Sequence, residues 1–367
     1  MRWKESVAVA LMVMVGAVSM ALAAGPTEHV ITISVDGMGA SYMQNLIDAG
    51  KLPNMQRLRA QGASTINART DYDYTITLPN HICMVTSRRV MGEEGHNWTN
   101  NGDPKPGETL HSNKKAHVAS AFEVAHDAGL RTGMWATKTK FSLFHESCKV
   151  AEAAESQANK MDVFYRQSTA ETLTASFLVE MKQRQLNYAF IHFGDTDGAG
   201  HSKGWGGEEY NAAMIRIDGC VGQILSLVES TDGLRGTTAI VVTADHGGEG
   251  KDHGDATKAI DYTIPFVVWG AGVDQGDLYA MNPTRQDPGT GRPTYAEEKQ
   301  PVRNGDAGNL GMRLLGLQAI PGSMIGNSLD LKTQKATAAQ PAPAPAQGSQ
   351  PALTMPKPTT QPSKQAA

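Results

Sequence analysis

A run of β-branched residues that leads into a turn of potential metal ligands constrains the fold of this chain most strongly. The run Ala239–Val242 is short and apolar, as is typical of a strand buried on both faces of a parallel sheet. The turn after it holds Asp245, His246 and His253 within nine residues. Parallel sheets place their sites beyond the carboxyl ends of strands, so we expect these side chains to line a site. A polar loop whose histidines bind only local backbone is the alternative for this stretch alone.

Three other predicted strands end in charged or polar side chains in the same way. The strand at 29–35 is followed by Asp36, the strand at 131–136 by Lys138 and Lys140, and the strand at 187–193 by Asp197 and His201. Because these ends meet at one edge of a parallel sheet, three carboxylates and three imidazoles would lie together there. Such a cluster is costly to bury unless cations neutralise it, and nitrogen and oxygen ligands suit zinc. The sequence therefore predicts a paired site for two Zn²⁺ ions or another divalent metal.

Thr77 lies just before a predicted helix that runs from about Pro79 to Thr86. The amino end of a helix favours an anionic phosphate and a developing alkoxide. A hydroxyl that binds a metal is also a stronger nucleophile than a free one. We therefore expect Thr77 to act as a nucleophile, with Thr75 as the second candidate. A β-branched residue that only finishes a strand is the alternative for both.

Strands and helices alternate along the chain. The segment from Tyr210 to Val228 has apolar residues at a clean 3.6-residue period, which predicts a helix. Further predicted elements are helices at 53–58, 116–128, from 168 and at 306–315, a strand at 264–269, and loops at 96–115 and up to 303. This alternation predicts an α/β fold, in which helices sandwich a mostly parallel sheet on both faces.

The two ends of the chain differ in composition from the region between them. Residues 1–24 combine basic Arg2 and Lys4 with an apolar stretch and small residues, the pattern of a secretory signal peptide, with a retained anchor as the alternative. Residues 333–367 are rich in Ala, Pro, Gln and Thr, which predicts a disordered tail. The folded catalytic domain is thus expected at 25–332, in a periplasmic or secreted protein.

The overall composition excludes some classes of partner. The chain is 40% hydrophobic and 19% charged, with a formal net charge of −4 and no basic stripe, so we expect no nucleic acid duplex as a partner. No other apolar run is long enough to cross a bilayer, so no membrane span is expected after signal removal. The three cysteines are an odd number and predict no particular pairing.

Four motifs resemble the alkaline phosphatase superfamily, and they occur in the order found there. They are Asp36 after the first strand, Thr77–His81, Asp197–His201 and Asp245–Gly247. The most similar branch is the type I phosphodiesterase/nucleotide pyrophosphatase group, over residues 29–330. The resemblance implies that one zinc is bound by Asp36, Thr77, Asp245 and His246, and the other by Asp197, His201 and His253. In nucleotide pyrophosphatases the last zinc histidine lies far downstream. This chain has no histidine after His253, which takes that role as in more compact bacterial members.

The same resemblance implies residues that contact the substrate. Asn100 matches the position that hydrogen-bonds a phosphoryl oxygen, and its neighbour Asn101 is the alternative. Lys138 and Lys140 resemble a Lys-x-Lys or Lys-x-Arg pair that contacts substrate in phosphate monoesterases and phosphonoacetate hydrolases of this clan. Two solvated lysines at the end of a strand are the alternative for that pair.

The resemblance implies an exported two-zinc phosphoric-ester hydrolase that forms a phosphothreonine on Thr77. Small phosphorylated molecules, either monoesters or diesters, are the expected substrates. The alternatives are a C–P hydrolase of the phosphonoacetate type and a non-catalytic metal-binding protein of the same fold. A sulfatase would resemble a Cys/Ser-x-Pro-x-Arg motif, but Thr77–His81 lacks both the convertible residue and the arginine. A cofactor-independent phosphoglycerate mutase is cytosolic, which the signal peptide argues against.

Overall fold

The computed structural model describes residues 27–150 and 159–335. The predicted signal peptide and residues 336–367 of the predicted tail lie outside these ranges. Thr333 is buried; its carbonyl accepts from the Asp274 N–H and its hydroxyl donates to the Gly272 carbonyl. The described fold therefore continues to Lys335, beyond the boundary expected at 332.

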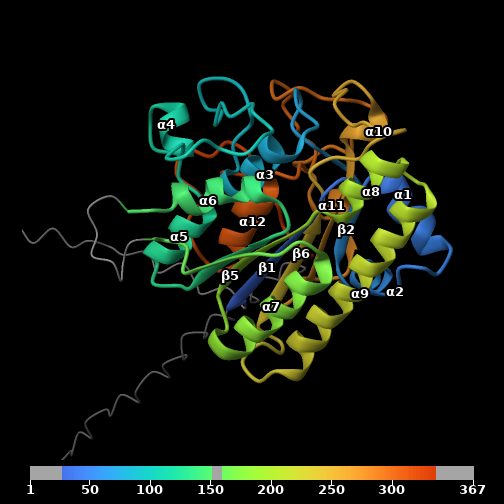
Figure 1. Ribbon diagram of the computed structural model, residues 1–367, viewed down its shortest axis with the longest axis horizontal. Helices are drawn as coiled ribbons and strands as arrows, with labels where there is room; N and C mark the ends of the chain where they lie inside the picture. Colours follow the sequence, from blue (N-terminus) through green and yellow to red (C-terminus); the bar gives the residue numbers. More distant parts are fainter. Residues whose placement is uncertain (1–26, 151–158, 336–367) are drawn as a thin grey trace, which may run out of the picture. The chain divides into compact units, whose positions relative to one another are not determined.

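An eight-stranded sheet forms the centre of the described fold (Figure 1). Its strand order is β4-β3-β5-β1-β6-β7-β2-β8. The strands are β1 (His29–Val35), β2 (Ala63–Arg69), β3 (Thr132–Ala136), β4 (Val163–Arg166), β5 (Tyr188–Phe193), β6 (Thr238–Thr243), β7 (Thr263–Gly270) and β8 (Gly276–Asp277). All neighbouring pairs are parallel except those of β7, which is antiparallel to β6 and β2. This confirms the predicted α/β class with a mostly parallel sheet.

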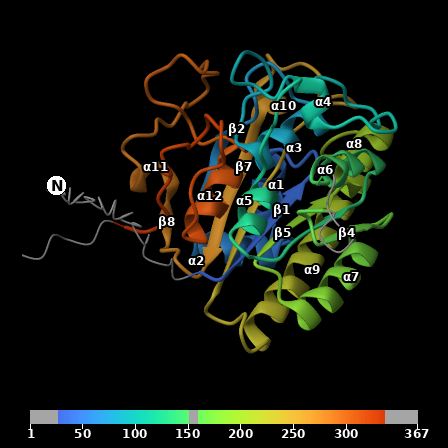
Figure 2. The same ribbon diagram turned by 90° about the vertical axis from the view of Figure 1, so that its left-hand side faces the viewer.

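Helices cover both faces of the sheet (Figure 2). One layer contains α1 (Ala40–Asp48), α2 (Pro53–Gln61), α7 (Ala170–Arg184), α8 (Asp195–Lys203) and α9 (Glu208–Ser230). The other contains α3 (Thr77–Thr86), α5 (Ala121–Asp127) and α12 (Asp306–Leu314), which contact one another. Short segments in the connections are α4 (Leu110–Lys114), the 3₁₀ helix η1 (Thr139–Phe141), α6 (Ser142–Ser147), α10 (Ala259–Tyr262) and α11 (Leu278–Met281). Because both faces are covered, β1, β3, β5 and β6 are buried at every position.

Sequence patterns missed or misplaced several elements. The edge strand β4 is only four residues long and half exposed, and β2 carries mainly small and polar residues, so neither shows a long apolar run. Helix α5 begins five residues after the expected start at 116, because Ser120 forms a capping box with Glu123. The expected loop at 96–115 contains α4, which has its own capping box at Thr109. Helix α3 begins at Thr77 and not at Pro79.

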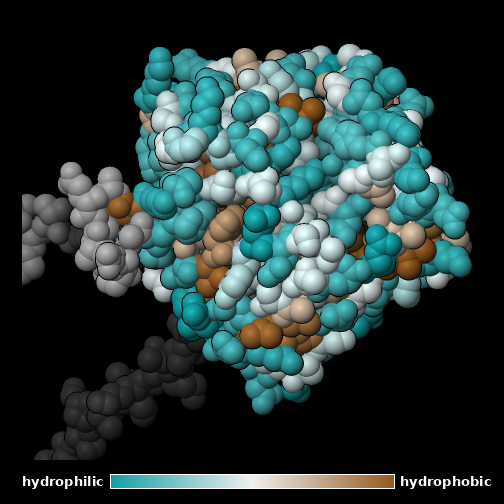
Figure 3. Space-filling model, viewed as in Figure 1, coloured by the Kyte–Doolittle hydropathy of each residue, from teal (hydrophilic) through white to brown (hydrophobic). Residues whose placement is uncertain are grey.

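The exposed apolar side chains are scattered over the surface. The face in Figure 3 is mainly hydrophilic, with a few separate hydrophobic patches. The large exposed hydrophobic residues among those described are Ile66, Met91, Tyr165, Val179 and Ile215. Among the described helices, none has the length and apolar character needed to cross a bilayer. Cys83, Cys148 and Cys220 are buried and free, so none of the three pairs with another.

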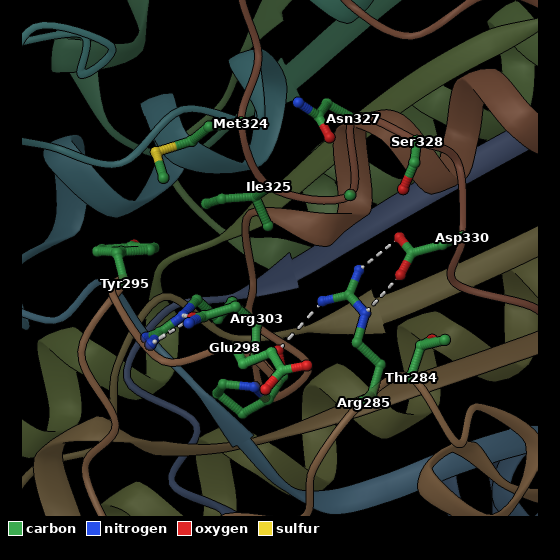
Figure 4. Close-up of a pocket in the computed structure, with 13 residues that line it drawn as sticks. Thr284, Arg285, Tyr295, Glu298, Arg303, Met324, Ile325, Asn327, Ser328 and Asp330 are labelled. Atoms are coloured by element: carbon green, nitrogen blue, oxygen red, sulfur yellow. Dashed lines mark hydrogen bonds and ion pairs between the residues drawn. The ribbon is translucent and has the colours of Figure 1, made fainter.

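A buried ion pair holds the segment after β7 against α12. The Arg285 guanidinium donates to Asp306 at 2.8 Å and to Asp330 at 3.0 Å. Figure 4 shows Arg285 beside Asp330 at a cavity of about 210 Å³. Arg285 and Asp306 are almost completely buried, whereas Asp330 is 31% exposed. Asp306 therefore depends on Arg285 for the compensation of its charge.

Replacement of Arg285 by methionine is expected to lower the free energy of unfolding by about 3–5 kcal/mol, because it leaves Asp306 buried without its partner. Chemical denaturation of the purified protein measures this loss. The matched control is Arg57→Met, which breaks the exposed pair between Arg57 and Glu229 and should cost about 0–1 kcal/mol. Equal losses in the two variants would contradict the prediction.

Candidate active site

The ends of four adjacent strands bring the predicted site residues together. In the order β3-β5-β1-β6, each strand delivers polar side chains just beyond its carboxyl end. Lys138 follows β3, Asp197 follows β5, Asp36 follows β1, and Asp245 follows β6. Figure 2 shows β1 pointing toward the side of the molecule where α3 and α8 lie. Parallel pairing thus produces the convergence that the sequence predicts.

Asp36, Asp245 and His246 form one group of candidate metal ligands, called here the Asp36 group. His246 Nε2 lies 3.4 Å from Asp36 Oδ1 and 3.2 Å from Asp245 Oδ2. All three side chains are completely buried. Gly37 adopts a φ of 74°, which L side chains rarely adopt, and its N–H donates to Asp245 Oδ1 at 3.0 Å. A glycine at this turn thus joins the ends of β1 and β6.

Asp197, His201 and His253 form a second group, called here the Asp197 group. Asp197 and His201 lie one turn apart on α8, and Asp197 Oδ1 is 3.3 Å from His201 Nε2 and 3.6 Å from His253 Nε2. The two Nε2 atoms are 3.1 Å apart. His246 Nε2 lies 4.0 Å from Asp197 Oδ1, so the two groups are neighbours.

Backbone carbonyls orient all three histidines. Nδ1 lies 2.8 Å from the Gly247 carbonyl in His246, 2.6 Å from the Thr75 carbonyl in His253, and 3.0 Å from the Lys251 carbonyl in His201. Because a carbonyl only accepts, each Nδ1 carries the proton when the ring is neutral, and each Nε2 turns a lone pair toward the carboxylates. Metal-binding histidines are commonly held in this way. The arrangement favours cation binding at both groups.

The rings of His246 and His253 are stacked, with centroids 3.6 Å apart and planes inclined by 6°. A ring nitrogen binds a metal in the plane of its ring, and two parallel planes do not meet at one ion. The two histidines are therefore arranged to serve two different cations, one in each group.

Several of the converging atoms have no hydrogen-bond partner within the described residues. These buried atoms are Asp36 Oδ1, Asp197 Oδ1, Asp245 Oδ2 and His246 Nε2. Buried polar atoms are normally paired, and unpaired ones cost free energy. Three of these atoms are carboxylate oxygens, and His246 Nε2 carries a lone pair because Nδ1 holds the proton. A cation can therefore bind all four. The residues present therefore fit two divalent metal ions with nitrogen and oxygen ligands.

Lys138 supplies a positive charge between the two groups. Its Nζ lies 2.6 Å from Asp36 Oδ2 and 2.6 Å from Asp197 Oδ2. Burial opposes ionisation of Asp36, but Lys138 and His192 hold its pKa well below the usual range. Burial and the neighbouring Asp36 raise the pKa of Asp245 well above that range. One ammonium thus leaves the three carboxylates short of positive charge.

The pKa values of Asp197 and of its neighbour His246 in the Asp36 group are both lowered, for different reasons. Burial and Asp36 oppose the shift, but His201 and Lys138 lower the pKa of Asp197 to about 2. Burial lowers the pKa of His246 to about 3, so this ring is neutral at physiological pH and able to bind a metal.

The structure distinguishes the two candidate nucleophiles. Thr77 is the first residue of α3, and its Oγ1 lies 3.5 Å from Lys138 Nζ. The hydroxyl of Thr75 instead donates to the His253 carbonyl at 2.5 Å. The hydroxyl of Thr77 lies beside the ammonium that contacts both candidate metal groups, whereas that of Thr75 binds the backbone of the loop that carries His253. The geometry favours Thr77 as the residue that meets a substrate.

Asn101, and not Asn100, lies beside Thr77. Asn101 Oδ1 accepts from the Leu78 N–H at 2.9 Å and from Lys140 Nζ at 3.3 Å. Asn100 is exposed, and its Oδ1 accepts from the Gly102 N–H in its own turn. This corrects the preference for Asn100 drawn from the sequence. The Trp98 indole, which donates to the Asn100 carbonyl, fixes the loop that turns the two side chains in different directions.

Two buried histidines next to the Asp36 group were not predicted as site residues. His192 Nε2 lies 2.9 Å from Asp36 Oδ2, and His81 Nδ1 lies 3.6 Å from Asp245 Oδ2. Burial lowers the pKa of both rings, so both are neutral. A signal for His192 exists in the sequence, since it is the one histidine in the otherwise apolar and aromatic run of β5.

Two tryptophans, Trp98 and Trp205, are buried inside the protein. Trp98 is 1% exposed and Trp205 is 7% exposed. The Trp205 indole donates to the Gly37 carbonyl at 3.0 Å and covers Gly200 and Gly248, where a Cβ atom would meet the ring at 2.6 and 2.4 Å. These contacts support the turns that carry the ligands.

A third cluster of potential ligands has a structural explanation. His111, His117 and Glu123 offer ligand atoms within 4.8 Å of one another. Both ring nitrogens of His111 are used, since Nε2 lies 2.7 Å from the Ser147 carbonyl and Nδ1 accepts from the Val118 N–H. This cluster therefore connects α4 to the start of α5 and offers fewer free ligand atoms than the two groups at the sheet edge.

A family profile matches most of this chain. The type I phosphodiesterase/nucleotide pyrophosphatase profile matches residues 30–306. Over 84 residues the chain is 32% identical to GPI ethanolamine phosphate transferase 1 of Mus musculus. That segment is 23% of this chain and only 9% of the length of the relative.

Solved structures with the same fold include both phosphodiesterases and phosphatases. Murine ectonucleotide pyrophosphatase/phosphodiesterase 5, as an inactive variant in complex with AMP, has a TM-score of 0.58 at 15% identity, over 83% of this chain and 99% of that chain. Wild-type alkaline phosphatase PafA has a TM-score of 0.56 at 11% identity, over 83% and 99%. An alkaline phosphatase superfamily protein from Vibrio parahaemolyticus has a TM-score of 0.57 at 13% identity, over 84% and 71%.

At these identities the structural similarity shows the fold alone, but the family profile covers most of the catalytic domain and all seven candidate ligands. The family and the fold together indicate a phosphoester hydrolase, and the structure holds two groups of candidate ligands for divalent metals at the sheet edge. The chain shares its fold with alkaline phosphatase superfamily structures, and it belongs to the type I phosphodiesterase/nucleotide pyrophosphatase family.

Proposed function

We propose that this protein is an exported phosphoric-ester hydrolase that uses two zinc ions and forms a phosphothreonine on Thr77. One observation carries the proposal. Lys138 Nζ lies 2.6 Å from a carboxylate of each ligand group and 3.5 Å from Thr77 Oγ1. A nucleophilic hydroxyl, a cation and both ligand groups are therefore gathered around one point.

The proposed ligand sets follow the two groups. Asp36, Asp245 and His246, together with the Thr77 hydroxyl, would hold one ion. Asp197, His201 and His253 would hold the other. Two bound divalent ions would supply Lewis acidity, which lowers the pKa of a bound hydroxyl and compensates charge on the phosphoryl group.

The residues of the chain itself account for the remaining chemistry. Thr77 Oγ1 attacks phosphorus, the bond from phosphorus to the leaving oxygen breaks, and the phosphoryl group is transferred to threonine. A water molecule then attacks the phosphothreonine, and phosphate leaves as Thr77 regains its hydroxyl. The amino end of α3 favours the negative charge that collects beside Thr77 throughout.

Asn101 and Lys140 are proposed to bind the phosphoryl oxygens. The side-chain oxygen Oδ1 of Asn101 accepts a hydrogen bond from the Leu78 N–H. The side-chain NH₂ of Asn101 is therefore the group that donates to a phosphoryl oxygen. Lys140 is half buried and contacts the same residue, and Lys138 lies close by. Two ammonium groups near Thr77 favour a phosphate monoester dianion over a diester with neutral arms. We therefore propose phosphate monoesters as the preferred class within the phosphoric esters.

Export is a separate part of the proposal. It is supported by the basic, apolar and small-residue pattern of residues 1–24, which lie outside the described residues. Fractionation of producing cells should find the protein in the periplasm or the medium, with a mature amino terminus near residue 25. An intact chain in the cytoplasmic fraction would refute export and leave the hydrolase proposal standing.

The nucleophile and metal assignments are tested together by comparing the wild-type protein with Thr77→Ala on a panel of phosphate monoesters, diesters and phosphonates. The variant should lose about 10³-fold or more in turnover, which corresponds to about 4 kcal/mol in the barrier. Chelation of the wild-type protein should abolish turnover, and zinc should restore it. Thr77→Ser should retain substantial activity. Turnover near wild type in Thr77→Ala, alongside loss in Thr75→Val, would show that the nucleophile is wrong.

The substrate preference is tested by Lys140→Ala. Loss of a charged hydrogen bond worth about 1.5–3 kcal/mol should reduce monoester turnover by roughly ten- to a hundredfold and diester turnover much less. Lys140 is a cleaner choice than Lys138, because Lys138 also contacts two candidate metal ligands. Lys105→Ala, which removes an exposed lysine outside the site, is the matched control and should change neither rate. Equal losses on both substrates would mean that Lys140 binds the shared phosphoryl group, and the monoester preference would be withdrawn.

A further inference from the structure

His192 lies near the carboxyl end of strand β5, and its ring is next to Asp36. It pairs in register with Ser34 of β1 and Ala136 of β3, and it is completely buried. Its ring centroid lies 4.0 Å from that of Phe141 and 4.9 Å from that of His81. The strand backbone and the two neighbouring rings therefore fix the position of this imidazole. The side chain of Lys138, by contrast, has four rotatable bonds.

The contacts of His192 decide which ring nitrogen carries the proton. Nδ1 lies 3.4 Å from the backbone nitrogen of Thr137 and 3.2 Å from its Oγ1. A backbone N–H only donates, so Nδ1 accepts, and the proton of the neutral ring is on Nε2. Thr137 is itself held by the Gly194 N–H, which donates to its Oγ1 at 2.8 Å. The ring therefore has one tautomer and one donor.

That donor faces a carboxylate whose two oxygens have different environments. His192 Nε2 is 2.9 Å from Asp36 Oδ2, and Lys138 Nζ contacts the same oxygen. Asp36 Oδ1 has no hydrogen-bond partner within the described residues and lies 3.4 Å from His246 Nε2. Oδ2 is thus held by two protein donors, and Oδ1 lies beside His246, the other side of the candidate metal site.

We propose that His192 is a positioning residue, whose Nε2–H holds Asp36 Oδ2 so that Oδ1 alone binds the cation of the Asp36 group. This inference rests on the proposed metal-dependent function. It assigns to His192 no contact with substrate. Donors that hold a metal-binding carboxylate or imidazole typically affect metal affinity by about 10–100-fold. The effect should be confined to one of the two ions, because His192 makes no contact with the Asp197 group.

The experiment measures zinc affinity at both sites of the full-length protein by competition with a chromophoric chelator. His192→Phe keeps a ring but removes the donor, and it should weaken one of the two ions about 10–100-fold and leave the other unchanged. His192→Gln places an amide donor near the same oxygen and should recover most of the affinity. His192→Leu repeats the test if the phenylalanine variant does not fold.

The matched control is His29→Phe. His29 is also buried, lies at the opposite end of β1 and hydrogen-bonds the Leu186 carbonyl. Its replacement should leave both zinc affinities unchanged, although it removes a buried imidazole in the same way. Unchanged affinities in folded His192→Phe, or an equally weak site in folded His192→Gln, would overturn the inference. A wild-type protein that binds no zinc or hydrolyses no phosphoric ester would instead refute the proposed function.

Discussion

The mutual repulsion of three buried carboxylates is the constraint on which the rest of this structure depends. Asp36, Asp197 and Asp245 lie at the ends of three adjacent strands, and Lys138 supplies one positive charge among them. In a medium of low polarity such a group is stable only with added cations or protons. The helix layers on both faces of the sheet, the glycine turns and the covering Trp205 keep the carboxylates in place despite that repulsion.

Much of the site could be predicted because its chemistry is local in sequence. Each ligand follows a strand whose apolar run is unmistakable, and parallel pairing brings such ends together without further information. Asp36, Asp197 and Asp245 needed only this argument. The amino end of a predicted helix pointed to Thr77 as a nucleophile, and the family resemblance added the expectation that it binds a metal. The structure placed its hydroxyl, and not that of Thr75, beside Lys138.

The rest could not be predicted, because it depends on backbone directions that spacing does not encode. Asn100 and Asn101 are neighbours of the same type, and a turn closed by the Gly102 N–H decides which one faces α3. The role of His192 depends on a tautomer set by Thr137, which is far from it in sequence. Strand β7 has an apolar run like those of the parallel strands β1, β5 and β6, although it runs antiparallel to both of its neighbours. Edge strand β4 is only four residues long, too short for a clear periodic pattern.

The position of β1 in the middle of the sheet has a consequence for how the protein matures. Its partners are β5 and β6, and the hydrogen bond from Gly37 to Asp245 joins residues 208 positions apart. Long-range pairing of this kind slows folding, because closing a large loop costs chain entropy before stabilising contacts can form. Neither ligand group can be assembled while the chain is still emerging beyond β1. On the proposed function, metal ions would therefore bind late, after the loop that follows β6 has joined the fold.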